Sequence, residues 1–291
     1  MPAAILDGKK ISAEIREELK GEAGRLKARG IVPALAGILV GEDPGSTTYV
    51  GLKTKACEEV GIREAMLHLP GDITQAELLS NIDKLNKDPN VHAIFIQLPL
   101  PKHLSEEKAL AAIRPEKDVD GFHEVNVGRA WLGQPCFVPA VVIAIQEMVT
   151  RGGYSFKDKN VVIVNVDSMV GKPLASVLVQ DKVGANVTLC NPATPGLATY
   201  TRCADVLVVS VNKPKFITAD MVKPGAIVVD FGATFVEDPV TKKRKTVGDV
   251  DFEPVKEKAG AITPVPGGVG PMLVTMLILG TVRAAQTAAK A

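Results

Sequence analysis

The sequence predicts an α/β protein in which parallel strands alternate with helices, and two observations carry that prediction. Short runs of Val, Ile, Leu and Ala recur along the chain and are typical of strands that are buried on both faces of a parallel sheet. Segments of helical periodicity separate these runs. Because a domain takes roughly 100 to 200 residues, a chain of 291 residues is expected to form two domains.

The first part of the chain predicts a helix followed by an alternating series. Apolar residues at helical spacing predict an amphipathic helix from Lys9 to Arg29, and a buried strand is expected over 33–41. The turn after it offers Ser46 as the N-cap of a helix that runs to about Val60. The series continues with strands over 65–69 and 93–98 and with helices that begin at Thr74, where Thr74 and Glu77 form a capping-box pair, and at Ser105.

A second alternating series begins near Asn160 and predicts a doubly wound, Rossmann-like parallel sheet. Its strands are expected over 160–166, 186–190, 206–211, 226–231 and 261–265, with a helix from about Gly171. A helix over 140–150 connects the two series, and a C-terminal helix over 271–289 is expected to return to the first domain. The predicted domains are therefore residues 1–139 with 271–291, and residues 140–270; the basic cluster 242–245 is expected at a hairpin or loop tip.

Composition excludes several function classes. The chain is 46% hydrophobic and 23% charged with a formal net charge of +1, so it has no broad basic field for nucleic acid. The most continuous apolar stretches, 138–145 and 272–279, are shorter than the roughly 18 to 20 residues that span a bilayer, and the N-terminus lacks the pattern of a signal peptide. We expect a cytoplasmic protein that binds neither nucleic acid nor a membrane.

The four cysteines predict neither a disulfide framework nor a metal site. Cys57, Cys136, Cys190 and Cys203 form no close pair, and no histidine lies near them at a metal-ligand spacing. We expect buried thiols and no bound metal.

Tyr49 and Lys53 are candidates for chemistry because they lie four residues apart and project from one helix face. By itself this spacing is common, and a surface lysine is the ordinary interpretation. The same face continues through Ala56, Cys57 and Val60, which are small or apolar. A lysine beside apolar surface has a lowered affinity for its proton, which suits a base or a proton shuttle.

Three loops carry further candidates. Gln97 stands where a strand is expected to end, at the edge where open α/β sheets bind ligands, although the prolines after it also suit a rigid turn. In the loop 117–122, one of Asp118 and Asp120 is expected to cap or turn, which leaves the other to accept hydrogen bonds from a ligand. The segment 264–272 holds three glycines and three prolines ahead of a helix, and such a loop lets backbone approach a ligand closely.

Taken together, these segments resemble a known enzyme family. In chain order they are GEDPGSTTYVGLKTKACEEVGI (41–62), IQLPLP (96–101), PEKDVDGFH (115–123), VGKP (170–173), KPGAIVVDFG (223–232) and TPVPGGVGPM (263–272). They resemble the bifunctional methylenetetrahydrofolate dehydrogenase/methenyltetrahydrofolate cyclohydrolases over nearly the whole chain. The resemblance implies a folate-binding catalytic first domain, a dinucleotide-binding second domain, folate bound between them and a homodimer.

The resemblance also implies two reactions and the residues that serve them. Methylenetetrahydrofolate is oxidised to the methenyl form with a nicotinamide cofactor, and the methenyl form is hydrolysed to 10-formyltetrahydrofolate. Lys53 is then the base or proton shuttle, Gln97 orients it, Tyr49 orders the substrate and Asp120 accepts hydrogen bonds from the pterin ring. The substrate-binding residues implied are Tyr49, Leu98, Pro99, Asp120, Pro266, Gly267, Gly268 and Pro271. The cofactor-binding residues implied are Asn165, Val166, Asp167, Val170, Gly171, Pro192, Ala233 and Thr234.

The dinucleotide half departs from the family pattern. Where the family has Gly-Arg-Ser, this chain has Asn165, Val166 and Asp167. Where the family has His-Ser-Arg/Lys-Thr, this chain has the segment 191–194. Both of the cations that usually bind the extra phosphate of NADP are therefore absent. Lys172 or Arg202 could supply a substitute cation. NADP is the family default, and NAD is the alternative that these residues favour.

Two other functions remain to be weighed. Asn212 replaces a family glycine, and the segment 139–144 also departs from the pattern, so a cyclohydrolase with weak or absent dehydrogenase activity is the principal alternative. A folate- or nucleotide-binding regulator is the other, and the intact set of Tyr49, Lys53, Gln97 and Asp120 argues against it.

Overall fold

The computed structural model describes residues 2–42, 44–237 and 244–290, without the side chains of residues 44–49. Its contacts divide the chain into two compact units. One consists of residues 1–12 and 141–273 and is called the six-stranded unit here. The other consists of residues 13–140 and 274–291 and is called the three-stranded unit.

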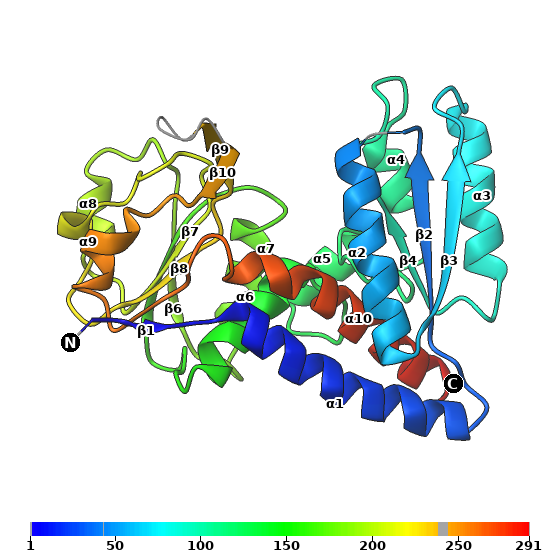
Figure 1. Ribbon diagram of the computed structural model, residues 1–291, viewed down its shortest axis with the longest axis horizontal. Coiled ribbons are helices and arrows are strands. Elements are labelled where there is room, and N and C mark those ends of the chain that lie inside the picture. Colours follow the sequence, from blue (N-terminus) through cyan, green and yellow to red (C-terminus); the bar gives the residue numbers. More distant parts are fainter. Residues whose placement is uncertain (1, 43, 238–243, 291) are drawn as a thin grey trace. The chain divides into compact units, whose positions relative to one another are not determined.

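The three-stranded unit contains a parallel sheet of order β3–β2–β4 (Figure 1). The strands are β2 (Ala34–Val40), β3 (Arg63–Leu69) and β4 (Ala93–Ile96). Its helices are α2 (Pro44–Val60), α3 (Gln75–Lys87), α4 (Glu106–Ala111) and α5 (Glu124–Trp131), with most of α1 (Gly8–Ala28) and of α10 (Val269–Ala288). The expected helices and strands of this part are present, and α5 is an additional helix.

Alternation along the strands divides the side chains of this sheet between two faces. Ile38 of β2 and Ile94 and Ile96 of β4 belong to one apolar cluster with residues of α3 and α4. The residues between them, Gly37 and Phe95, therefore point to the opposite face. Every residue of β2 is buried, as expected for the central strand of a sheet covered on both sides.

Capping residues confirm two of the predicted helix starts. Thr74 and Glu77 form the reciprocal capping box ahead of α3, and the Ser105 hydroxyl accepts the Lys108 N–H ahead of α4. The prediction of Ser46 as the N-cap of the following helix is wrong, because α2 begins at Pro44, a residue favoured at the first helical position, and Ser46 lies within the helix.

The C-terminal helix α10 returns to the three-stranded unit, as the sequence predicts. Gln286 donates a hydrogen bond to Glu22 of α1 at 3.0 Å, and Gly280 lies against Val119. By length and composition α10 could also cross a membrane, but 67% of its most apolar stretch is buried inside the protein. That burial is typical of a core helix.

The six-stranded unit is a wholly parallel sheet of order β1–β11–β8–β7–β5–β6. Its strands are β1 (Ala4–Ile5), β5 (Asn160–Val164), β6 (Asn186–Cys190), β7 (Val206–Val209), β8 (Ile227–Asp230) and β11 (Ala261–Ile262). Its helices are α6 (Ala140–Arg151), α7 (Gly171–Leu178), α8 (Leu197–Thr201), the 3₁₀ turn η1 (Ala219–Met221) and α9 (Phe252–Lys256).

One feature of this unit, its N-terminal strand, differs from the sequence expectations. The N-terminal strand β1 pairs with β11, so residues 1–12 belong to the six-stranded unit. The sequence predicts no strand there and places all of residues 1–139 in the first domain. An antiparallel hairpin of β9 (Thr234–Glu237) and β10 (Arg244–Val247) follows β8. Of the basic cluster, Arg244 and Lys245 lie on β10, while Lys242 and Lys243 lie outside the described residues.

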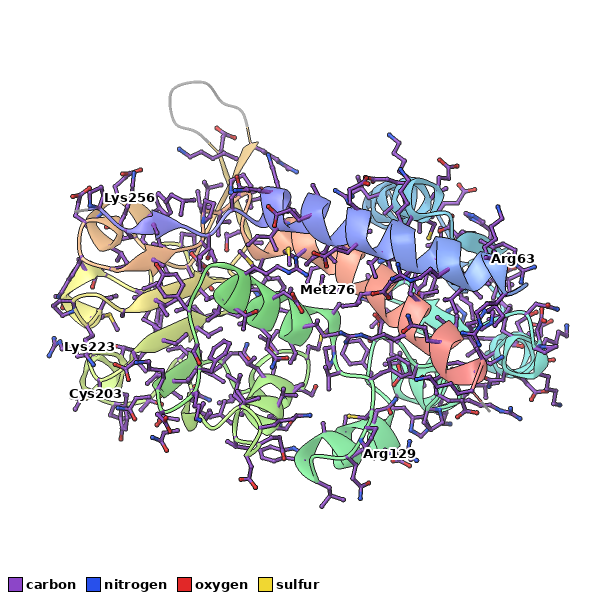
Figure 2. The ribbon with its side chains drawn as sticks, turned by 90° about the horizontal axis from the view of Figure 1, so that it is seen from below. Arg63, Arg129, Cys203, Lys223, Lys256 and Met276 are labelled. Carbon is purple, nitrogen blue, oxygen red and sulfur yellow. The ribbon has the colours of Figure 1, made fainter. Side chains whose placement is uncertain are left out.

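The expectation of four buried thiols is wrong for two of them. Cys57 and Cys190 are buried, whereas Cys136 is partly exposed and Cys203, labelled in Figure 2, is exposed. Cys203 follows the short helix α8, and its thiol donates to the Thr199 carbonyl at 3.3 Å. No group of three or more potential metal ligands occurs among the described residues.

Candidate active site

Lys53 extends from α2 towards the end of β4, where two side chains hold its amine. The Nζ atom donates a hydrogen bond to Gln97 Oε1 at 3.1 Å and lies 3.7 Å from the centre of the Phe95 ring. Gln97 is itself oriented, because its Nε2 donates to the Leu98 carbonyl at 2.9 Å. Phe95 and Gln97 are two residues apart in an extended segment, so they reach the same face. The predicted pairing of Lys53 with Gln97 is therefore present in the structure.

Burial lowers the pKa of Lys53 below its usual value. The negative charge of Asp120 opposes this most strongly, followed by Glu64 and then Cys57. The amine is thus partly desolvated but remains within the field of nearby carboxylates. A lysine in this setting can both accept and release a proton.

The two aspartates of the loop after β4 have different environments. Asp118 is buried, and its Oδ2 accepts the His123 N–H at 2.8 Å and the Asn126 side-chain amide at 2.9 Å. Gly121 closes this turn with a φ of +67°, and a Cβ there would lie 2.6 Å from the Val138 backbone. Asp118 is therefore the turn-forming carboxylate.

Asp120 faces Lys53 instead. Burial raises the pKa of Asp120 to about 6, the charge of Lys53 lowers it, and the neighbouring Asp118 raises it further. Its carboxylate makes no hydrogen bond to any of the side chains and backbone groups that the structure describes. The expectation that one aspartate turns the chain while the other remains available is consistent with this geometry.

Other predicted substrate residues lie in both units. Leu98 and Pro99 follow Gln97 and are joined by a cis peptide bond, whereas the Tyr49 side chain is outside the described part. In the six-stranded unit, Gly267 accepts the Gly8 N–H at 3.0 Å through its carbonyl, and Gly268 lies so close to Gly8 that a side chain on Gly8 has no room.

Pro266 and Pro271 flank this glycine contact. Pro266 is joined to Val265 by a cis peptide bond, and the Pro271 carbonyl accepts the Ser12 hydroxyl at 3.2 Å.

The loop between β5 and α7 is held by its own polar side chains. Asp167 Oδ1 accepts the Met169 and Val170 N–H groups at 2.9 and 2.7 Å, and Asn165 Oδ1 accepts the Gly171 N–H at 2.8 Å. The helix N-terminus that could meet a phosphate is therefore occupied by these two side chains. Val166 adds no charge.

Asn165 also spans the point where the strand order of the sheet reverses. Its Nδ2 donates to Asp167 and to the Ser210 carbonyl, each at 2.8 Å, and Ser210 directly follows β7. Since β5 lies between β6 and β7, the loops after β5 and β7 flank the crevice in which open α/β sheets bind ligands. The Asn165 side chain thus ties these two loops together.

A buried carboxylate positions the next loop. Asp249 accepts the N–H groups of Val211, Asn212 and Lys213 at 2.5 to 3.0 Å. This holds Asn212 in the left-handed region, with a φ of +53° that asparagine tolerates better than most residues.

The remaining predicted cofactor residues lie in the same unit. Pro192 belongs to a turn in which Asn191 accepts the Ala193 N–H, and Ala233 directly precedes β9. The hydroxyl of Thr234 is buried and has no hydrogen-bond partner in the described structure. An orphaned buried hydroxyl is suited to a polar group of a bound ligand.

Comparison with known proteins decides the family. The tetrahydrofolate dehydrogenase/cyclohydrolase catalytic domain matches residues 6–120, and the NAD(P)-binding domain of the same proteins matches residues 139–289. The chain belongs to this family. Two relatives are the bifunctional protein FolD of Syntrophus aciditrophicus, 50% identical over 99% of both chains, and that of Dehalococcoides mccartyi strain CBDB1, 51% identical over 99% of this chain and 98% of its own.

Solved structures agree with the family assignment. The bifunctional FolD enzyme of Campylobacter jejuni is 45% identical, with a TM-score of 0.93 over 98% of this chain and 99% of its own. The Trypanosoma brucei enzyme, solved with NADP and an inhibitor, is 35% identical, with a TM-score of 0.92 over the full length of both chains. The resemblance found in the sequence is confirmed, and the chain is a methylenetetrahydrofolate dehydrogenase/cyclohydrolase with a nicotinamide cofactor.

Sequence reasoning missed several residues that build the site. Phe95 was counted only as a strand residue, and Glu64 and Asp249 were not singled out. Gly37 carried a usable signal, because an isolated glycine within a strand often marks a close approach of another group. The partners of these residues are distant in sequence, so spacing could not find them.

The two loop aspartates should respond oppositely to substitution. Asp118→Ala removes the acceptor of the part-buried His123 N–H and of one proton of the buried Asn126 amide, so we expect it to lower the free energy of unfolding by about 2 to 4 kcal/mol. Asp120→Ala, the matched control, should change it by less than about 1 kcal/mol. Urea unfolding monitored by circular dichroism measures both, and equal losses in the two variants would contradict the assignment of Asp118 as the structural one.

Proposed function

We propose that Lys53 is the base of the cyclohydrolase reaction and that Gln97 orients it. The contact between Lys53 Nζ and Gln97 Oε1, together with the lowered pKa of Lys53, is the observation that supports this role. A neutral amine takes a proton from water as the water oxygen bonds to the methenyl carbon. The ammonium so formed gives its proton to the ring nitrogen as the carbon–nitrogen bond breaks. The freed amine then takes the remaining hydroxyl proton as the carbonyl forms and releases it to solvent, which yields 10-formyltetrahydrofolate.

Asp120 is proposed to bind the pterin ring of the substrate. Its carboxylate has no other described hydrogen-bond donor to satisfy it and can accept a pair of N–H groups. Its position near Lys53 would bring the one-carbon bridge of the folate towards the base. Tyr49, Leu98, Pro99, Pro266, Gly267, Gly268 and Pro271 are proposed as further substrate contacts.

The dinucleotide is proposed to lie at the carboxyl ends of β5 and β7, near Asn165, Val166, Asp167, Val170, Gly171, Pro192, Ala233 and Thr234. When bound, it supplies the acceptor for the hydride that leaves the one-carbon bridge. The buried Thr234 hydroxyl without a partner fits a polar group of such a ligand. The chain's own residues contribute orientation and the exclusion of water.

NAD is the cofactor that this loop favours over NADP. The Asp167 carboxylate already accepts the two amides that directly precede α7, and its charge would repel an additional phosphate. Arg202 donates to the Asp220 carbonyl and lies 3.7 Å from its carboxylate, so it is engaged elsewhere. Lys172, in the first turn of α7, is the remaining candidate cation. A homodimer and a cytoplasmic location stay predictions from the sequence.

Replacing the base should separate catalysis from binding. We expect Lys53→Met to lower the rate of methenyltetrahydrofolate hydrolysis by about 10² to 10⁴-fold, because the water loses its proton acceptor. Hydrolysis is followed by loss of methenyl absorbance, with folate affinity and thermal unfolding as controls. An unchanged rate in a folded, folate-binding variant would remove Lys53 from the mechanism.

Folate affinity should depend on the charge of Asp120. Its pKa of about 6 means that the carboxylate becomes protonated as the pH falls through 6, so we expect wild-type affinity for a non-reactive folate analogue to weaken below that pH. Asp120→Asn should bind roughly 10 to 100-fold more weakly at pH 8 and lose the pH dependence. Calorimetric titration from pH 5 to 8 tests this, and retention of the wild-type profile by the variant would refute the role.

Cofactor choice should follow the charge of the loop before α7. Wild-type enzyme is expected to have the higher kcat/KM with NAD, and the Val166→Arg, Asp167→Ser double variant should raise the NADP/NAD ratio of kcat/KM by about 10-fold or more. Lys172→Ala is the companion variant. Preference of the wild type for NADP, lost in Lys172→Ala, would show instead that Lys172 receives the phosphate.

A further inference from the structure

The ring of Phe95 lies directly beneath the amine of Lys53. Phe95 is fully buried in β4, and Lys53 Nζ is 3.7 Å from the centre of its ring. This distance is well within the range in which the face of an aromatic ring attracts a cation. The amine therefore has two ordered neighbours, the Gln97 carbonyl oxygen and the π-face of Phe95.

Gly37 makes room for this ring. In the parallel register Gly37 of β2 lies opposite both Phe95 of β4 and Met66 of β3. A Cβ on Gly37 would lie 2.5 Å from Phe95 Cζ and would also overlap the Met66 sulfur. Any side chain on β2 at this point would push the ring aside. The bare backbone of Gly37 thus lets Phe95 extend across β2 beneath α2.

The ring acts together with the charged groups around the amine. Glu64 of β3 stands two residues before Met66 and so shares its face, and one of its carboxylate oxygens is buried without a hydrogen bond. Cys57 lies one helical turn after Lys53 on α2, and Asp120 approaches from the loop after β4. Among the described side chains these three are the titratable groups that act on Lys53, whereas Phe95 and Gln97 of the β4 segment are neutral.

We propose that Phe95 is a positioning residue for Lys53. The face of the Phe95 ring holds the Lys53 amine in place and stabilises its ammonium form, and the ring occupies the space that Gly37 leaves open. The inference rests on the role proposed above for Lys53. When Lys53 takes a proton from the attacking water, the charge forms over the ring and beside the Gln97 oxygen. The ring therefore favours the charged form that develops during the reaction.

The test replaces the ring by an aliphatic side chain. Phe95→Leu keeps the site apolar but removes the π-face, so the pKa of Lys53 should fall by about 0.5 to 1 unit. Ile94→Leu is the matched control, because Ile94 is buried in the same strand but faces the cluster of α3 and α4. The pKa is obtained from the pH dependence of trace acylation of Lys53, quantified by peptide mass spectrometry. This readout does not depend on catalysis.

The rate of methenyltetrahydrofolate hydrolysis provides the second readout. In the pH–rate profile of Phe95→Leu, the rising part of the curve should move to lower pH by the same amount, about 0.5 to 1 unit. On the plateau of the profile, kcat should fall about 3 to 10-fold, with a smaller change in KM. Ile94→Leu should match the wild type in both. Thermal unfolding checks that each variant is folded, and Phe95→Met replaces Phe95→Leu if the latter is not.

The outcomes distinguish this inference from the proposed function. An unchanged Lys53 pKa in the folded ring variant, or an equal shift in Ile94→Leu, would overturn the inference. If Lys53→Met hydrolyses methenyltetrahydrofolate at the normal rate, Lys53 is not the base. The catalytic part of the inference then fails as well, even if acylation still shows that the Phe95 ring changes the pKa of Lys53. A shift in both acylation and rate, absent from the control, supports it.

Gly37 offers an independent check by a double-mutant cycle. Gly37→Ala alone should displace the ring and lower the pKa of Lys53 in the same direction as Phe95→Leu. In the Phe95→Leu background the same alanine should have little further effect on the Lys53 pKa, because no ring remains to be displaced. Additive shifts in the double variant would overturn the proposed coupling between Gly37 and Phe95.

Discussion

The candidate site of the three-stranded unit depends on holding the amine of Lys53 partly out of water. Desolvation disfavours the charge on Lys53, and an isolated buried ammonium would be costly. The structure offsets this with the Gln97 oxygen, the face of Phe95 and the nearby carboxylates of Asp120 and Glu64. The balance leaves an amine whose pKa is lowered by burial but which stays within the field of nearby carboxylates.

The pleat of β4 lets one short strand serve both the core and the site. Ile94 and Ile96 fill the cluster beneath α3 and α4, while Phe95 and then Gln97 are turned towards the amine of Lys53. A shift of register by one residue would exchange these two sets. The buried apolar residues therefore fix the register that places Phe95 and Gln97 beside Lys53.

The six-stranded unit shows the opposite arrangement, in which a position suited to an anion is filled from within. Asp167 accepts the two amides before α7 and Asn165 accepts the first amide of the helix, so the loop is ordered by the chain itself. An external phosphate would have to displace a carboxylate of the same sign. This internal cap stabilises the helix terminus, and it is the feature on which the proposed preference for a dinucleotide without an extra phosphate rests.

The sequence by itself determined the alternating strands and helices, the capping box at Thr74 and the return of the C-terminal helix. These follow from local periodicity and local hydrogen bonds, which spacing along the chain expresses directly. It also indicated that one of Asp118 and Asp120 turns the chain, but the residue types alone did not say which, because the acceptors and donors involved come from the turn as folded.

Only the tertiary structure decided that Asp118 is the buried acceptor, that β1 joins β11, and that Phe95 reaches Lys53 across Gly37. Each of these depends on segments far apart in the chain that meet through sheet register. A glycine in β2, an aromatic ring in β4 and a lysine on α2 have no sequence spacing in common. Their contact exists because parallel pairing aligns them and helix packing covers them.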